Sequence, residues 1–241
     1  MMGRRVGVFA LIFMAFMVRA GAADLNIAVD RSTEMPWSAF ANGEIVGGIH
    51  RDIGVALAQR LGRRPHFVIL PRRRVPLALA SGQADIACVL LPEWLPGTYR
   101  WTDPFVWNGD VVITARTVAQ PSSIEALAGE PIGTINGFAY PPLNQALGKN
   151  FIRDDAPDAS TNLRKLELGH LKHVVVNERY FEYQRRRGYP KVPIYPPLVV
   201  ARQQLPCALS PASSVPLKAL NDAIGEVVRS GELKRMLEAY R

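Results

Sequence analysis

The sequences LNIAV (25–29), IHRDIGVALAQRL (49–61) and HFVIL (66–70) decide the fold class of this 241-residue chain. The first and the third are short apolar runs that contain isoleucine and valine, which is typical of strands. The second places its apolar residues on one face at helical spacing and ends at Gly62. A strand, a helix and a strand in this order predict a parallel βαβ unit with a right-handed crossover.

The alternation of strands and helices continues along the chain. An expected helix at 74–80 precedes an expected strand at 85–91, and a β-type run occupies 109–118. After the polar break at 120–123, strands and helices begin again, which indicates a second lobe. The segment from residue 206 holds another strand and two helices, so we expect the chain to return to the first lobe. Two connections between the lobes would form a double hinge.

The sequence therefore predicts an α/β protein of two lobes, each with a mixed sheet flanked by helices. We place lobe 1 at 23–114, lobe 2 at 115–200, and the return to lobe 1 with the C-terminal helices at 201–241. In open sheets of this kind, ligands bind beyond the carboxyl ends of the parallel strands.

Residues 1–22 have the three parts of a secretory signal peptide. Two arginines precede the apolar run 6–18, and a small-residue A-x-A site ends at Ala22. The run is shorter than the roughly 20 apolar residues that span a bilayer. We expect cleavage after Ala22 and a soluble periplasmic protein, without a lipid anchor because no cysteine lies near the site.

The charge and composition exclude several function classes. Removing residues 1–22 takes away three arginines and no acid, which lowers the net charge from +8 to +5. This excess is moderate, and no basic stripe with interleaved aromatic residues accompanies it, so we expect no nucleic-acid partner. No zinc-type cluster of cysteine and histidine occurs, and the sequence predicts neither a metal nor a cofactor.

Several segments in a fixed order carry a resemblance to a known family. In the first half they are LNIAVD, MPWS, GGIHRDIGVALAQRLG, ALASGQADIA and YRWTDPFVWNGDVVIT, and in the second LAGEPIGTINGFAY, LELGHLKHVVVN and LKALNDAIGEVVRSGELKRMLEAY. Their order and spacing resemble the family 3 extracellular solute-binding proteins, the amino-acid-type receptors of bacterial ABC importers. The resemblance implies the periplasmic binding protein type 2 fold, a monomer, and an importer permease as partner.

The resemblance also implies a ligand cleft, and this chain departs from the usual pattern there. Trp37 stands where the family places an aromatic residue that stacks on the ligand. Leu95 stands where an arginine usually holds the α-carboxylate, and Asn177 replaces the aspartate that usually takes the ammonium. These departures predict that the ligand is a small polar or anionic solute other than a standard free amino acid.

Further residues are candidates for the same cleft. Each has a structural alternative: a solvated charge, a turn or an ordinary hydrogen-bond acceptor. The turn Asn136-Gly137-Phe138 keeps backbone donors near a helix N-terminus that could hold an anion. The candidates in the first lobe are Glu34 in the loop of Trp37, Arg74 of the run 72–74, and Glu93 and Trp94 after the third strand.

Two questions stay open at this stage. In the receptors that the chain resembles, the strand returning from lobe 2 lies beside the third strand of lobe 1, so Cys88 and Cys207 are expected to form a disulfide; two buried free thiols are the alternative. We expect a binding protein and not an enzyme. The alternatives are a cyclohexadienyl dehydratase-like enzyme that uses Glu34, Glu93 and Arg74, or a free sensory receptor.

Overall fold

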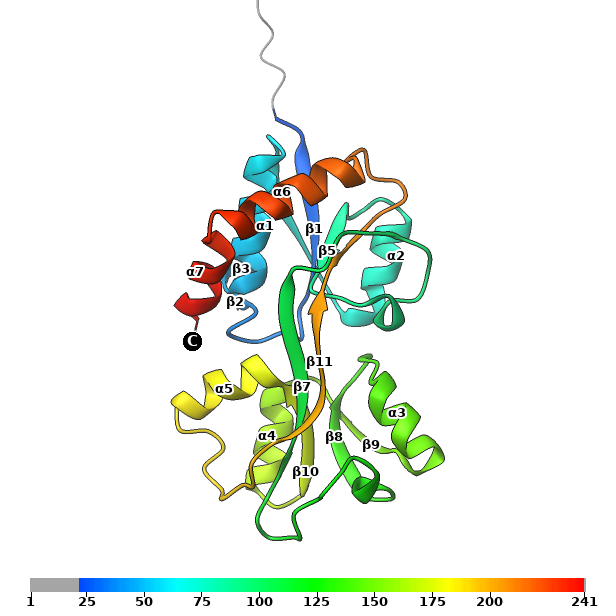
Figure 1. The fold of residues 1–241 in the computed structure, drawn as a ribbon, viewed down its shortest axis with the longest axis vertical. Helices are drawn as coiled ribbons and strands as arrows, with labels where there is room; N and C mark the ends of the chain where they lie inside the picture. The colour runs from blue at the N-terminus through cyan, green and yellow to red at the C-terminus, as the bar shows by residue number, and fades with distance from the viewer. Residues whose placement is uncertain (1–21, 241) are drawn as a thin grey trace, which may run out of the picture.

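The protein folds into two lobes connected by two long strands, as the computed structural model shows for residues 22–240 (Figure 1). The predicted signal peptide lies outside the described residues except for Ala22. Within this described part, no helix is long and apolar enough to cross a membrane.

Lobe 1 contains a five-stranded mixed sheet in the order β4-β1-β5-β12-β6. Strand β1 is parallel to both neighbours, whereas β12 is antiparallel to β5 and β6. Its strands are β1 (Asp24–Asp30), β4 (Arg64–Leu70), β5 (Ile86–Cys88), β6 (Arg100–Trp101) and β12 (Cys207–Leu209). A separate hairpin, β2 (Ala39–Ala41) and β3 (Glu44–Gly47), and the helices α1 (Ile49–Arg60), α2 (Val75–Ala80), α6 (Leu217–Arg229) and α7 (Glu232–Ala239) surround it.

Helix α1 packs against this sheet through the face that its sequence pattern predicts. Ile49, Ile53 and Leu57, spaced four residues apart, are almost completely buried in the core of lobe 1. A side chain at Gly54 would meet Ile27 and Phe67 at 2.8 Å, so the helix and the sheet are in close contact there. The apolar face that the pattern of 49–61 predicts therefore packs α1 against β1 and β4.

Lobe 2 contains a second mixed sheet in the order β11-β7-β10-β8-β9. Strand β8 pairs in parallel with both β10 and β9, whereas β7 is antiparallel to β10 and β11. The strands are β7 (Val106–Thr114), β8 (Pro131–Ile135), β9 (Ile152–Ala156), β10 (His173–Asn177) and β11 (Leu198–Leu205). The helices of this lobe are α3 (Pro141–Leu147), α4 (Ala159–Glu167) and α5 (Glu178–Arg186).

Strands β7 and β11 form the connection between the lobes, and they lie side by side (Figure 1). Both strands belong to the second sheet, so in the sequence this sheet extends from Val106, the first residue of β7, to Leu205, the last residue of β11. The predicted lobe boundaries fall at the end of β7 (114/115) and within β11 (200/201), and they stay a prediction. A strand that crosses a hinge continues the alternating pattern of the sheet that it enters, so its sequence shows no break.

Most of the expected elements are present, and several others are not visible in the sequence pattern. The run 66–70 belongs to β4, and the run 131–135 is β8. The expected strand at 85–91 is shorter, since β5 ends at Cys88 and Val89 has a positive φ of 62°. No prediction was made for β2, β3, β6 or the hinge strand β11.

The two cysteines join neighbouring strands of lobe 1. Cys88 on β5 is opposite Cys207 on β12, and the structure forms a disulfide between them. Their Cα atoms are 3.8 Å apart, closer than the range of about 4.4 to 6.8 Å on which the expectation was based. The bond links β12, the strand that returns from lobe 2, to β5, the central strand of the lobe 1 sheet.

Candidate functional site

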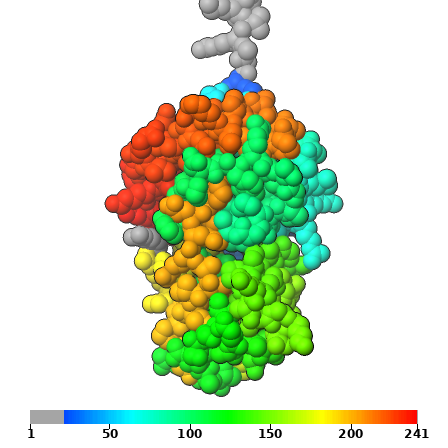
Figure 2. All heavy atoms as spheres, turned by 45° about the vertical axis from the view of Figure 1, so that its right-hand side comes forward, coloured from blue at the N-terminus to red at the C-terminus, as the bar shows by residue number. Residues whose placement is uncertain are grey.

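A cavity of about 130 Å³ lies between the two lobes, and both lobes line it. Side chains and loops that follow the carboxyl ends of β1, β4, β5, β8 and β10 meet there, which is the position where ligands bind in open α/β sheets. Figure 2 shows the atoms of the two lobes in contact on the face that it presents. The lobes are therefore closed around the cavity.

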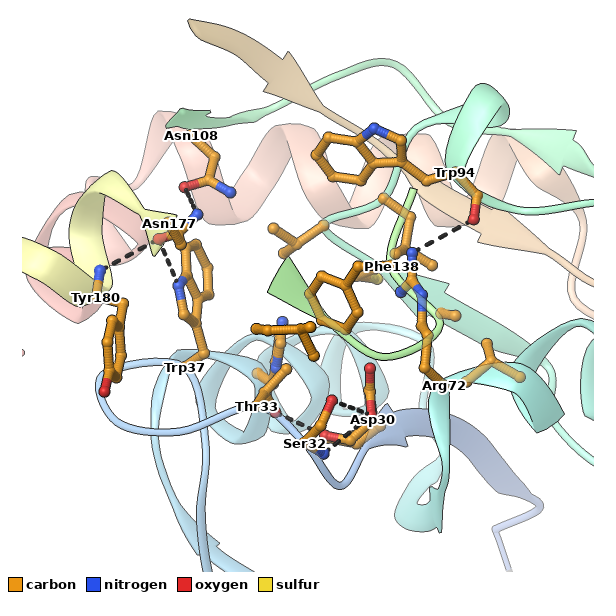
Figure 3. A pocket seen from close by; sticks show the side chains of 18 of the residues that line it. Asp30, Ser32, Thr33, Trp37, Arg72, Trp94, Asn108, Phe138, Asn177 and Tyr180 are labelled. Carbon is orange, nitrogen blue, oxygen red and sulfur yellow. Dashed lines mark hydrogen bonds between the residues drawn. The ribbon is translucent and has the colours of Figure 1, made fainter. Parts of the chain in front are cut away.

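Trp37 and Asn177 connect the lobes at one side of this cavity (Figure 3). The indole Nε1 of Trp37 donates a 2.9 Å hydrogen bond to Oδ1 of Asn177. The same oxygen accepts from the backbone N of Tyr180 and caps helix α5, while Nδ2 of Asn177 donates to Oδ1 of Asn108 at 2.6 Å. Both residues line the cavity, as expected, but their polar atoms already have partners within the protein.

The backbone at Gly48 sets the position of Trp37. Gly48 precedes α1 with φ 101°, and a Cβ atom there would lie 2.5 Å from the carbonyl oxygen of Trp37. This close approach lets the N–H of His50 donate to that carbonyl at 2.9 Å. The ring of Trp37 then lies 5.3 Å from the ring of His50, and the Trp37 side chain is buried.

Two further hydrogen bonds cross from lobe to lobe. The carboxylate of Glu34, which lines the cavity, accepts from the backbone N of Ser160 at the start of α4, at 2.9 Å. The guanidinium of Arg73 donates to Oδ1 of Asn136 at 2.8 Å, and both of these residues are exposed. The lobes thus meet through polar contacts on several sides of the cavity.

The turn 136–138 serves this contact instead of an anion site. Asn136 and Gly137 do not line the cavity, whereas Phe138 does. The N–H of Asn136 donates to the carbonyl of Ala156, and that of Phe138 to the carbonyl of Ile135. These donors were expected to be free for an anion; the turn and the neighbouring strand use them. A Cβ at Gly137 would lie 3.1 Å from Cγ of Arg73, so the glycine permits the lobes to approach.

Among the described residues that line the cavity, the one arginine is Arg72, and Arg74 is not in the lining. Residues 72–74 form a single 3₁₀ turn, in which consecutive side chains project about 120° apart, so only one of them faces the cavity. Arg74 is exposed. The guanidinium of Arg72 lies 5.1 Å from the ring centre of Phe138 and within 3.5 Å of the carbonyl of Trp94 (Figure 3). Burial lowers the pKa of Arg72, and the negative charge of Asp30 opposes that shift.

The segment after β5 contributes one of its two candidates. Trp94 lines the cavity, but Glu93 is exposed, because the short turn Pro92–Trp94 points its middle residue outward. Leu95 is buried in the core against α2 and is absent from the cavity lining. Position 95, where the resemblance leads one to expect an arginine, is therefore a core position in this protein and does not belong to the cleft.

Three acids line the cavity beside this single arginine: Asp30, Glu34 and Asp110. Asp30 ends β1 and is 6 % exposed; its Oδ1 accepts from the N–H and the hydroxyl of Ser32. Among the residues that the structure describes, no hydrogen-bond partner reaches its Oδ2. Burial raises the pKa of Asp30, and Ser32 and Arg72 oppose that shift. Burial also raises the pKa of Glu34, against the hydrogen bond from Ser160.

Asp110 is the acid of the hinge strand β7. Part of its surface faces the cavity, yet the surrounding protein raises its pKa from an ordinary 3.8 to about 7 by desolvation. Within residues 22–240, its carboxylate has no hydrogen bond or ion pair. Asp110 is the cross-strand partner of Asn177 on β10. The resemblance leads one to expect an acid at position 177 on β10, and this protein instead has an acid, Asp110, at the paired position on β7.

His50 also lines the cavity, as do the ionisable side chains of Tyr140 and Tyr180. The Nδ1 of His50 shares a 3.1 Å hydrogen bond with the hydroxyl of Ser38, and burial lowers the pKa of His50 to about 4. The ring is therefore neutral at physiological pH. The site contains three carboxyl groups, one guanidinium and a neutral imidazole, among apolar residues of both lobes.

Sequence reasoning missed Asp30, His50, Arg72 and Asp110. Asp30 immediately follows the run 25–29, at the carboxyl end of a predicted parallel strand, and this position was an available signal. An acid within the apolar run 109–118 was a second signal, because unpaired acids are rarely buried. The choice of Arg72 over Arg74 had no signal, since it depends on the direction of one turn.

The residues considered for a dehydratase do not come together. Glu34 lines the cavity, while Glu93 and Arg74 are exposed and lie outside it. The described residues also contain no group of three histidine, cysteine, aspartate or glutamate side chains that could hold a metal ion.

Comparisons with known proteins agree with this architecture. No family model matches the chain. The chain is 23 % identical over 218 residues to a probable amino-acid-binding protein, YxeM, of Bacillus subtilis, which covers 85 % of this chain and 79 % of that protein. Among solved structures, an ancestral arginine-binding protein bound to arginine has a TM-score of 0.76 at 19 % identity and covers 90 % of this chain and 98 % of its own.

A third similar protein is a binding protein that is described as the precursor of a dehydratase. It is the ancestral amino acid-binding protein AncCDT-1, a precursor of cyclohexadienyl dehydratase, with a TM-score of 0.73 at 18 % identity; the match covers 90 % of this chain and 95 % of that one. These likenesses confirm the two-lobed α/β fold, and with the sequence relative they confirm the resemblance to the family 3 solute-binding proteins.

Proposed function

We propose that this chain is a solute-binding protein of the amino-acid-transporter type, which encloses a small solute between its lobes by hinge closure. The observation that carries the proposal is the cavity, because residues of both lobes line it, and because the hydrogen bonds that Trp37 donates and Glu34 accepts join the lobes there. A solute that contacts both lobes gains all of its contacts only in the closed form, so its binding shifts the population toward closure.

The solute is a small molecule. A cavity of about 130 Å³ is well below the roughly 300 to 1,000 Å³ that is usual for drug-sized ligands. Trp94 and Phe138 offer apolar contact surface to its body. Three acids against one arginine do not favour an anion, so we no longer expect an anionic solute.

The weak binding of standard free amino acids stays a prediction. One of its two grounds has changed, because Leu95 is a core residue and Arg72 supplies a cation from another position. The other ground applies to position 177 only, since the Asn177 amide cannot neutralise an ammonium group and is engaged by protein atoms, whereas the acids of the cavity lie at other positions. Calorimetry with glutamine, arginine, histidine and glutamate tests the prediction, and submicromolar binding of any of them would contradict it.

The protein acts outside the cytoplasm and delivers its solute to an ABC importer permease, as a monomer. This part of the proposal rests on the signal-peptide pattern of residues 1–22 and on the similarity to an amino-acid-binding protein. Intact mass of exported protein should show that it begins at Ala23. Recovery of the uncleaved chain in a membrane fraction would speak against this location.

A thermal-shift screen tests the binding function itself. Exported protein is screened against amino acids, polyamines, organic acids and short peptides, since a ligand that binds only the folded state raises the unfolding temperature. Small-angle X-ray scattering then compares the protein with and without each stabilising solute. We expect at least one solute to raise the unfolding temperature and favour the compact form. A screen with no such solute would reject the function.

We propose that the protein is not an enzyme. The separation of Glu34 from Glu93 and Arg74 supports this, because acid catalysis needs its groups on one substrate. Incubation with prephenate or arogenate should give no aromatic product, and turnover of either compound would revive the dehydratase alternative.

A further inference from the structure

The acids of the cavity outnumber its arginines among the residues that the structure describes. The whole chain has a formal net charge of +8, yet among the described residues the cavity is lined by three acids, one arginine, two tyrosines and a histidine that burial keeps neutral. Burying an ionised carboxylate without a partner is costly, and native proteins normally pair such groups. Among the described residues, the charges of Arg31 and Arg72 act on Asp30, whereas burial alone raises the pKa of Asp110, so the closed cavity keeps an excess of acidic groups.

Two of the three acids have free carboxylate oxygens. Glu34 accepts the N–H of Ser160 at the start of α4 and is accounted for. Asp30 is more than nine-tenths buried, and its Oδ2 has no hydrogen-bond partner among residues 22–240. Figure 3 shows Asp30 between Ser32 and Arg72 with its carboxylate toward the interior of the cavity. Arg72 lies near enough to influence Asp30 but forms no ion pair with it in the described part of the chain.

Asp110 is brought to the cavity by the strand geometry of the hinge. Alternate residues of β7 point to the same side, so Asn108 and Asp110 both line the cavity, while Trp107, which precedes them on the opposite side of the strand, is 60 % exposed. Asp110 is opposite Asn177, whose amide is held by Trp37 and Asn108. The amide is thus part of the closure contact, and Asp110 is the acid beside it with an unoccupied carboxylate.

We propose that Asp110 binds a protonated amine of the solute, with Asp30 as a second acid at the same cavity, and that the solute class is a small organic amine. This inference rests on the proposed function and names its ligand chemistry. The amine supplies a counter-charge to Asp110, and the apolar lining contacts the remainder of the solute. Because β7 connects the lobes, an amine held by Asp110 is held at the hinge.

Three solutes with one carbon skeleton separate the charges. 3-Methylbutylamine carries only the amine, 4-methylpentanoate carries only the carboxylate, and L-leucine carries both. Calorimetry at pH 8, where the acids are ionised, compares them, with putrescine as a further amine. We expect 3-methylbutylamine or putrescine to bind, L-leucine to bind more weakly because it is a standard free amino acid, and 4-methylpentanoate to fail. Failure of every amine-bearing probe, or binding of 4-methylpentanoate alone, overturns the proposal.

The isosteric variant Asp110→Asn tests the residue. Affinity for the amine that binds should fall at least tenfold, as expected for the loss of a charge-assisted bond. Asp103→Asn is the matched control, since Asp103 is exposed on the segment before β7, and its affinity should be unchanged. Equal affinities of Asp110→Asn and the parent protein overturn the assignment.

A measurement without ligand gives an independent answer. If Asp110 is an uncompensated buried acid, Asp110→Asn should raise the unfolding temperature of the ligand-free protein at pH 8, and Asp30→Asn should do the same while it keeps the Ser32 contacts at Oδ1. A lowered unfolding temperature in Asp110→Asn would mean that the acid has a structural partner, and the proposal would be wrong.

The two proposals fail in different ways. If neutral or anionic solutes close the protein and no amine does, Asp110 is not a ligand residue, but the hinge-closure function stands. If no solute of the wider screen stabilises the protein or changes its scattering, the binding function itself is rejected.

Discussion

The indole Nε1 of Trp37 and the Oδ1 of Asn177 are 2.9 Å apart, and this hydrogen bond joins the two lobes through residues that are 140 positions apart in the chain. The same Asn177 oxygen caps α5, so the cap and the closure contact depend on one atom. Asn177 is thereby oriented from both sides, and the closed form has a specific polar contact at the side of its cavity.

Removing the N–H donor of this bond, together with the pyrrole part of the indole ring, should favour the open form. Trp37→Phe deletes a hydrogen bond with a net value of about 0.5 to 1.5 kcal/mol, which corresponds to a loss in solute affinity of about 2- to 12-fold. Calorimetry with the solute found in the screen measures it, and scattering of the ligand-free protein should show a larger radius of gyration. Trp107→Phe, at a largely exposed tryptophan of β7, is the control. An equal effect of both variants would contradict the role of the Trp37 bond.

The raised pKa of Asp110 gives stability a defined pH dependence. Its folded pKa is about 7 and its unfolded value about 3.8, so between these values the folded state binds more protons and its stability falls as pH rises. Relative to the parent protein, Asp110→Asn should gain stability from about pH 4 to about pH 7 and stay constant above. Chemical denaturation across this range measures the difference. A difference that does not change with pH would refute the assigned pKa.

His50 contributes with the opposite sign. Its folded pKa of about 4 lies below the unfolded value of 6.5, so the unfolded state binds more protons between these values and stability rises with pH. The two slopes oppose each other from about pH 4 to 6.5 in the parent protein, which is why the comparison needs variants. His50→Gln should gain relative stability as the pH is lowered from about 6.5 to 4.

The disulfide between Cys88 and Cys207 should be a major contributor to stability. It closes a loop with a sequence separation of 119, and native disulfides typically contribute about 2 to 4 kcal/mol. Denaturation of the Cys88→Ser/Cys207→Ser protein should show a loss of this order. Thiol titration of unfolded, unreduced protein should find no free thiol, and the detection of two would contradict the bond.

Gly48 should tolerate no side chain. Its backbone has φ 101° and ψ 166°, a region that costs other residues about 1 to 3 kcal/mol, and a Cβ would also lie 2.5 Å from the Trp37 carbonyl. Gly48→Ala should destabilise the protein and displace Trp37. Gly43→Ala is the matched control, because Gly43 also has a positive φ of 80° but open space around it. Its smaller loss would isolate the effect of crowding; equal losses would argue against it.

The alternation of apolar patterns predicted the fold class, because the period of a strand or a helix is a local property. Residues 25–29, 49–61 and 66–70 form a strand, a helix and a strand, as their patterns predict, and the restart after 120–123 marks the second lobe. The hinge strand β11 escaped prediction because its stability comes from pairing with β7, a partner far away in the sequence.

The sequence by itself also predicted that Glu34, Trp37, Trp94, Phe138 and Asn177 are cleft residues, and all five line the cavity. Only the tertiary structure decided the charges of the site. It turned Arg72 inward and left Arg74 exposed, and it placed Asp110 opposite Asn177 across two antiparallel strands. The direction of one turn and the register of two distant strands set these positions, and both depend on how the lobes pack and not on the local pattern of residues.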